Sequence, residues 1–172
     1  MIKSNQINKI TNKLFKKVII ADTFAIWATA GFDNATTLNL LEAWITSLSY
    51  TFQLYFDFSG YTDMAIGAAL LFNIKLPLNF NSPYKATGII DFWQRWHISL
   101  STWFRDYVYI PLGGNRVVKW RWYYNLMITF VVSGIWHGAN WTFLIWGFLH
   151  GFYLVFAILS ENWRRKITFS LG

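Results

Sequence analysis

The segment from Trp122 to Ser160 contains no Asp, Glu, Lys or Arg, and it constrains the fold more than any other part of the sequence. Its 39 residues are too many for one bilayer crossing, which takes about 20 residues, and are enough for two. Gly134 and Gly138 mark a natural break near His137. Basic residues flank the segment, which indicates that both of its ends are cytoplasmic. They are Arg116, Lys119, Arg121, Arg164, Arg165 and Lys166. The sequence therefore predicts a helical hairpin over 122–160 with its apex near His137.

The composition supports a membrane protein and excludes several other classes. Charged residues make up 13% of the chain and aromatic residues 21%, whereas a disordered chain is rich in charge and poor in aromatics. The net charge is +7, but the basic residues do not line one polar element, so we expect no nucleic-acid partner. There is no cysteine, which excludes disulfides, a thiolate nucleophile and cysteine metal sites. We predict an all-α, polytopic integral membrane bundle with the lipid bilayer as a partner.

Residues 1–31 form a basic segment that we expect to lie at the membrane interface. Its lysines and its apolar residues recur at helical spacing, as in an amphipathic helix on an anionic leaflet. A cleavable signal peptide is the alternative, because Ala28-Thr29-Ala30 resembles a cleavage site. Asp22 interrupts the apolar stretch and argues against cleavage. We therefore predict a short interfacial or re-entrant segment here.

Residues 38–74 are predicted to contain one span and one short helix. Leu38–Phe56 is just long enough to cross a bilayer core. We expect Phe58-Ser59-Gly60 to break the helix, and Met64–Ile74 to be a separate short helix. The polar, turn-rich residues 75–90 predict a loop.

Residues 91–109 are predicted to form one amphipathic helix at the interface or beside a cavity. Its apolar and aromatic side chains recur at steps of three and four: Trp93, Trp96, His97, Leu100, Trp103, Phe104 and Tyr107. Pro111 and Gly113-Gly114 end the pattern.

Three histidines are candidates for chemistry. His137 lies within the charge-free segment, and an ionisable side chain at membrane depth indicates function. A neutral imidazole can take a proton from a hydroxyl near pH 7. The alternative is a histidine hydrogen-bonded to a backbone carbonyl. His97 could be a general acid, a partner that orients His137, or a packing residue. His150 follows His137 by 13 residues, about 220° around one continuous helix, so we expect it to serve in packing.

Two carboxylates and two arginines are further candidates. Asp57 and Asp63 lie in segments expected at membrane depth, where a carboxylate needs an oppositely charged partner. Arg95 and Arg105 are the candidates that we expect. An ion-pair clamp between helices is favoured over direct catalysis. The arginines could instead bind a phosphate-bearing donor. The sequence has neither zinc-ligand spacing nor a Gly-x-Ser-x-Gly element, so we expect no metal and a direct transfer without an acyl-serine.

These residues together resemble the membrane-bound O-acyltransferase (MBOAT) family. The resemblance is carried by Asp91–Tyr107 (DFWQRWHISLSTWFRDY), by Ile110–Arg116 (IPLGGNR) and by Ser133–Trp141 (SGIWHGANW), which looks like the catalytic-histidine motif of the family. Tyr55–Gly67 and Trp146–Gly151 are similar to the preceding and following segments. The IPLGGNR stretch resembles the bacterial alginate O-acetyltransferase branch, whose pattern peptidoglycan and cellulose O-acetyltransferases share.

The resemblance implies a function and a site. It implies transfer of acetyl groups from acetyl-CoA or another acetyl thioester to hydroxyls of an exported polysaccharide, by a multi-pass protein of the inner (cytoplasmic) membrane without a bound cofactor. His137 matches the catalytic histidine and His97 the second histidine near the reaction tunnel. Further substrate-binding or tunnel-lining positions are predicted at Trp136, Asn140, Arg95, Arg105, Asp57 and Asp63. Two alternatives remain open: a membrane subunit that relays acyl groups to a periplasmic acetyltransferase, and D-alanyl transfer to teichoic acid.

The length of the chain sets an expectation about its activity. Members of the family are several hundred residues long, and the 172 residues resemble one partial membrane domain, the central catalytic portion. A fragment, one chain of a two-chain assembly and a degenerate gene product are the alternatives. We expect the 172 residues alone to lack several tunnel walls and to be inactive.

Overall fold

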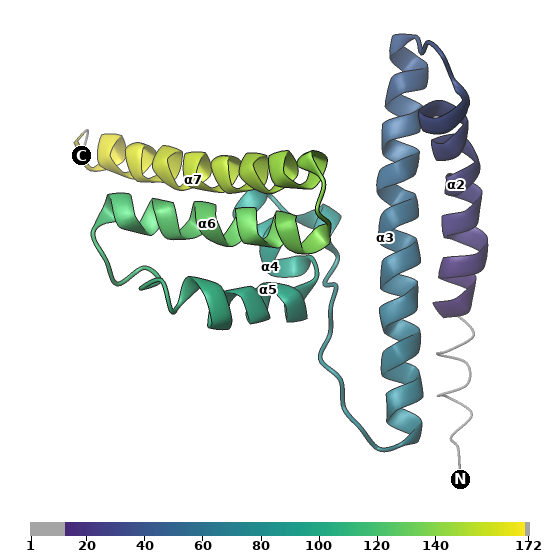
Figure 1. Ribbon diagram of the computed structural model, residues 1–172, viewed down its shortest axis with the longest axis horizontal. Helices are drawn as coiled ribbons and strands as arrows, with labels where there is room; N and C mark the ends of the chain where they lie inside the picture. The colour runs from purple at the N-terminus through teal and green to yellow at the C-terminus, as the bar shows by residue number, and fades with distance from the viewer. Residues whose placement is uncertain (1–12, 171–172) are drawn as a thin grey trace. The chain divides into compact units, whose positions relative to one another are not determined.

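The computed structural model describes the backbone of residues 13–170 and the side chains of residues 13–161. Every regular element in these residues is a helix, so the all-α prediction is confirmed. The chain forms two compact units, Met1–Asn79 and Phe80–Gly172 (Figure 1). Most of the basic segment predicted to lie on the membrane surface, residues 3–12, falls outside the described residues.

The first unit is a pair of long helices that lie side by side (Figure 1). The first helical stretch consists of η1 (Lys16–Ala21), α2 (Asp22–Thr29) and η2 (Ala30–Asn34), where η1 and η2 have π-helical geometry. The second is α3 (Leu40–Leu71). A capping box begins α3: the Asn39 side chain accepts a hydrogen bond from the Glu42 amide at 3.0 Å, and the Glu42 carboxylate accepts one from the Asn39 amide at 2.9 Å.

The predicted helix break at residues 58–60 is wrong, because α3 runs without interruption for 32 residues. Ser59 and Gly60 are buried against the neighbouring helix. A Cβ atom on Gly60 would lie 3.2 Å from both the Lys13 carbonyl oxygen and the Lys17 Cβ atom. Gly60 thus permits two helices to approach closely instead of ending one of them. Residues 64–71 of the predicted separate helix are the last part of α3, which ends at Leu71.

The second unit begins with a loop and two short helices. The loop contains a single 3₁₀ turn, η3 (Pro83–Lys85), and leads into α4 (Ile89–Arg95). After Trp96 the chain continues as α5 (Ile98–Phe104) and a π-helical turn, η4 (Arg105–Tyr109). The loop predicted over 75–90 is therefore observed up to Gly88.

The single helix predicted over 91–109 is wrong, since the chain breaks at Trp96 and His97. Trp96 is extended, with ψ 127°, and His97 adopts left-handed backbone angles, φ 44° and ψ 55°. The predicted aromatic stripe divides at this break. Trp93 packs within the unit, with its ring 5.2 Å from that of Phe130. Trp103, beyond the break, is 48% exposed.

Two long helices, α6 (Lys119–His137) and α7 (Trp141–Ser170), form the hairpin of the second unit and lie side by side in Figure 1. Their turn follows His137, where the sequence predicts it. Two glycines bring the helices together. A Cβ atom on Gly134 would lie 2.3 Å from the Phe143 carbonyl oxygen, and one on Gly147 would lie 2.5 Å from the Phe130 carbonyl oxygen. Small residues at such a crossing are typical of membrane helices.

Within the described part of the chain, one helix has the length and apolarity to cross a membrane. This stretch is Trp141–Glu161 of α7, and its mean hydropathy is 1.9. Only 11% of it is buried in the structure, which distinguishes it from the core helix of a soluble protein.

Candidate active site

His137 is the last residue of α6, and aromatic rings surround its imidazole. The ring centroids of Trp136 and Trp146 both lie 5.1 Å from that of His137 in edge-to-face geometry. The Phe143 ring stacks on the imidazole at 5.9 Å. Gly138 allows this stacking, because a Cβ atom there would lie 2.9 Å from the Phe143 ring. The imidazole itself is exposed, so a substrate can reach it.

The predicted lining residues Trp136 and Asn140 lie on either side of this turn. Trp136 is 57% exposed beside His137. The Asn140 side chain accepts a hydrogen bond from the Thr142 amide at 3.2 Å, and the Asn140 amide donates one to the Gly138 carbonyl at 2.9 Å. Asn140 therefore fixes the start of α7 and the turn that carries His137.

His97 lies close enough to His137 for the charge of one imidazole to act on the other. Burial, and secondarily the charge of His137, lower the pKa of the His97 imidazole below its usual value of 6.5. Its ring stacks on Phe80 at 6.4 Å. His97 follows the end of α4 and has a left-handed backbone conformation. Such a conformation costs roughly 1–3 kcal/mol in a residue other than glycine. Strain of this kind is common at functional sites.

The lowered pKa of His97 predicts a pH-dependent stability of the full-length protein. Because the folded state binds the proton less readily than the unfolded chain, the stability that neutral His97 contributes is fully present above pH 6.5. It is lost as the pH falls through the folded pKa. Asparagine tolerates the same backbone angles and does not titrate. We therefore expect the Tm in detergent to fall less steeply from about pH 8 to about pH 5 in His97→Asn than in the unchanged protein. Equal slopes would contradict this assignment.

Sequence reasoning missed a cluster formed by Trp93, Trp146 and His150. The expectation that His137 and His150 point apart assumed one continuous helix, but they lie on two helices. The Trp146 ring lies 5.1 Å from His137 and 4.6 Å from His150. Trp93 of α4 adds edge-to-face contacts at 5.9 Å to Trp146 and 5.1 Å to His150. The spacing of Trp146 and His150, four residues on one helix, is the sequence signal that could have paired them.

Two buried polar atoms of this cluster have no hydrogen-bond partner among the described residues. They are the Nε1 atom of Trp93 and the Nδ1 atom of His150. An unpaired buried polar atom costs about 1–3 kcal/mol. Both atoms lie in side chains that reach Trp146, which places this cost beside the candidate catalytic histidine.

Arg95 and Arg105, predicted as partners of Asp57 and Asp63, each form an ion pair within their own unit. Arg95 Nε donates to Asp91 at 2.6 Å and lowers the pKa of that carboxyl, and Arg105 Nε donates to Asp106 at 2.7 Å. Arg95 also donates to the Asn81 carbonyl oxygen at 3.4 Å. It therefore holds the loop against α4, directly before the backbone turn at His97.

Asp57 and Asp63 instead bond lysines of their own unit. Lys13 lies 2.7 Å and Lys16 lies 3.3 Å from the same Asp63 oxygen, and Lys17 pairs with Asp57. The N-terminal lysines were assigned to the membrane surface, so sequence reasoning overlooked them as partners. The carboxylates join the first helical stretch to α3, which is the arrangement of an ion-pair clamp.

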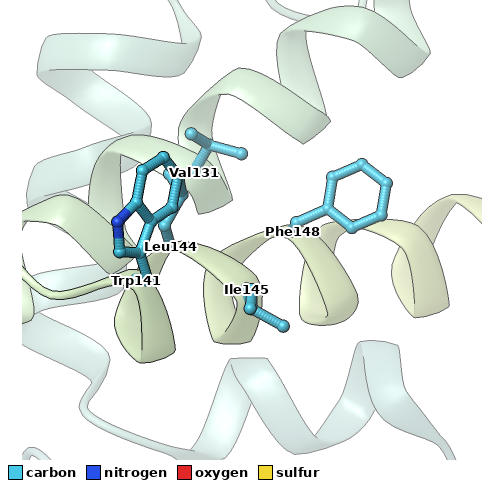
Figure 2. A pocket seen from close by; sticks show the side chains of 5 residues that line it. All are labelled: Val131, Trp141, Leu144, Ile145 and Phe148. Atoms are coloured by element: carbon cyan, nitrogen blue, oxygen red, sulfur yellow. The ribbon is translucent and has the colours of Figure 1, made fainter.

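Figure 2 shows an apolar pocket on the hairpin, with a volume of about 390 Å³. Five apolar side chains line it: Val131, Trp141, Leu144, Ile145 and Phe148. None of them can take a proton from a hydroxyl or return one to a leaving thiolate. The imidazoles of His137 and His97 do not line this pocket.

Comparison with known proteins agrees with this arrangement. The family model described as "MBOAT, membrane-bound O-acyltransferase family" matches residues 13–170. The chain is 60% identical to a peptidoglycan O-acetyltransferase of Helicobacter pylori and 55% identical to a probable alginate O-acetylase of Azotobacter vinelandii, over 92% and 81% of its length. It is 34% identical to a teichoic acid D-alanyltransferase of Bacillus subtilis over 93% of its length.

The matches cover a minority of each relative. The chain spans 30%, 28% and 42% of the length of these three proteins, respectively. The family model nevertheless extends across both units, from the lysines of the ion-pair clamp to the last helix, and it includes His97 and His137. The chain therefore belongs to the membrane-bound O-acyltransferase family, whose members are membrane proteins.

Proposed function

We propose that the protein to which this chain belongs is a membrane O-acetyltransferase that modifies hydroxyl groups of an exported or cell-surface polysaccharide. The exposed imidazole of His137, held among aromatic rings at a helix turn, is the observation that carries the proposal. Identities of 60% and 55% to a peptidoglycan O-acetyltransferase and a probable alginate O-acetylase support acetyl transfer. The identity to a D-alanyltransferase is lower, at 34%, which favours acetyl over D-alanyl as the group transferred.

In the proposed reaction, His137 acts as the general base. Its neutral imidazole takes the proton of the acceptor hydroxyl as the oxygen attacks the thioester carbonyl carbon. The carbon–oxygen bond forms, the carbon–sulfur bond breaks, and the leaving thiolate recovers the proton from the imidazolium. The donor is acetyl-CoA or another acetyl thioester. His97, neutral at pH 7 because of burial, orients the acceptor or relays its proton.

The proposed setting is a multi-pass bundle in the inner (cytoplasmic) membrane. The donor reaches the site from the cytoplasm and the acceptor from the outer side. The apolar surface of α7 supports insertion, and the glycine crossing of α6 and α7 supports a second helix beside it in the bilayer.

The direct test uses the purified full-length protein in lipid vesicles with isotopically labelled acetyl-CoA and glycan oligosaccharides. We expect labelled ester on the glycan, released as acetate by mild base, at a level at least about tenfold above protein-free vesicles. A vesicle sample that transfers label only after a periplasmic acetyltransferase is added would instead support the relay function. Labelled D-alanyl donors in the same assay test the remaining alternative.

A further inference from the structure

The orientation of the His137 imidazole has to come from its ring contacts. A functional histidine is ordinarily oriented by a hydrogen bond to its second ring nitrogen. Within the second unit, over residues 80–161, no side chain or backbone group forms a hydrogen bond with the His137 ring, and no carboxylate forms an ion pair with it. The ring contacts that the structure gives for His137 are with Trp136, Phe143 and Trp146.

Among these neighbours, Trp146 is the least exposed. Trp136, which contacts the Phe104 ring at 6.3 Å, is 57% exposed and Phe143 is 39% exposed, whereas Trp146 is half-buried. His150 contacts Trp146 from one turn further along α7, and Trp93 contacts it from α4. The next residue, Gly147, packs against the α6 backbone at the helix crossing. Trp146 thus links the position of His137 to three helices.

Trp146 can also act on the positive charge that His137 acquires as a general base. His137 becomes a cation when it takes the hydroxyl proton, and a cation over the face of an indole, within about 6 Å of its centroid, is attracted by the ring quadrupole. The Trp136 and Trp146 rings both lie 5.1 Å from that of His137 in edge-to-face geometry, within that distance. Of the two, Trp146 is the less exposed and has contacts from α4 and from His150, so its indole is the one whose position is fixed.

We propose that Trp146 is a positioning residue, which orients the His137 imidazole and stabilises its protonated form during acyl transfer. This inference rests on the proposed function, because it takes His137 as the general base. It assigns a role to a residue that sequence analysis placed only within the Trp146–Gly151 segment. The cluster of Trp93 and His150 serves to hold the indole.

The test compares Trp146→Phe and Trp146→Leu in the full-length protein, with Trp120→Leu as the matched control. Trp120 is 68% exposed and lies in the first turn of α6, at the opposite end of that helix from His137. We expect Trp146→Leu to lower kcat about 5- to 30-fold with little change in KM. We also expect the pKa of the His137 imidazole, read from the kcat–pH profile of this variant, to fall, because the imidazolium loses a stabilising neighbour. Trp146→Phe should show a smaller change in the same direction, and Trp120→Leu none.

The outcomes separate this inference from the function on which it rests. An active His137→Ala variant would overturn the general base, whatever Trp146 does. If His137→Ala is inactive while Trp146→Leu keeps the unchanged kcat and pH profile, the function stands and the role of Trp146 is wrong. If Trp146→Leu fails to fold, Trp146→Phe decides: a wild-type pH profile overturns the proposal, and a lowered pKa supports it.

Discussion

Replacement of His137 by alanine is expected to reduce acetyl-ester formation by the full-length protein by about 100- to 10,000-fold, the usual contribution of a general acid–base group. The imidazole is the one exposed proton acceptor at the turn between α6 and α7 among the described residues, and its neighbours there are apolar rings. None of these rings can replace it as a base. The measurement is base-released acetate per protein molecule after incubation with acetyl-CoA and glycan.

The control for this variant is Ile135→Ala, on the same helix end. Ile135 is 55% exposed and lies two residues before His137, so its truncation tests the general effect of a small change at this turn. We expect near-normal ester formation by Ile135→Ala, and normal membrane insertion by both variants. Added imidazole should restore part of the activity of His137→Ala, because a free base can enter the space left by the side chain. Ester formation by His137→Ala at the unchanged rate would refute the assigned role.

The sequence was sufficient for the hairpin because two independent signals agreed. The charge-free run from Trp122 to Ser160 has the length of two helices, and Gly138 supplies the turn between them. Where a single signal was ambiguous, the prediction failed. Gly60 is compatible with either a helix break or a close helix contact, and only the tertiary partner, the backbone at Lys13, decides between them.

The candidate site was predictable in its principal residue and not in its supporting ones. His137 could be identified because an ionisable group in an apolar segment is energetically costly and therefore indicates a function. The backbone turn at His97 could not be predicted from the spacing of apolar residues, because their steps of three and four continue across it. The contact of Trp146 with His137 could not be predicted from the sequence pattern either. In a chain with 11 tryptophans, no spacing distinguishes the one that contacts His137 from those that face outward.

Substitution of Gly134 by alanine is expected to cause the largest loss of stability of any single-methyl addition in the hairpin. The added Cβ atom would lie 2.3 Å from the Phe143 carbonyl oxygen and 3.2 Å from the Gly147 Cα atom. Both neighbours are backbone atoms, so the helices must separate. Overpacking of this kind costs about 1–3 kcal/mol or more. The shift would also move His137, three residues further along α6, away from Trp146, and ester formation should fall with stability.

The matched control is Gly88→Ala, because a Cβ atom at that loop position has no neighbour within 4 Å. Both substitutions add one methyl group, at the N-cap of α4 in one case and inside α6 in the other. A helix interior favours alanine over glycine by about 1 kcal/mol, so a loss of stability in Gly134→Ala reports the crowding around the new atom. We expect the Tm of the full-length protein in detergent to fall by several degrees in Gly134→Ala and to stay unchanged in Gly88→Ala. Equal melting temperatures would show that α6 and α7 do not cross at these glycines. The ring contacts of His137 would then lose their structural basis, since the same crossing brings α7 and Trp146 to the end of α6.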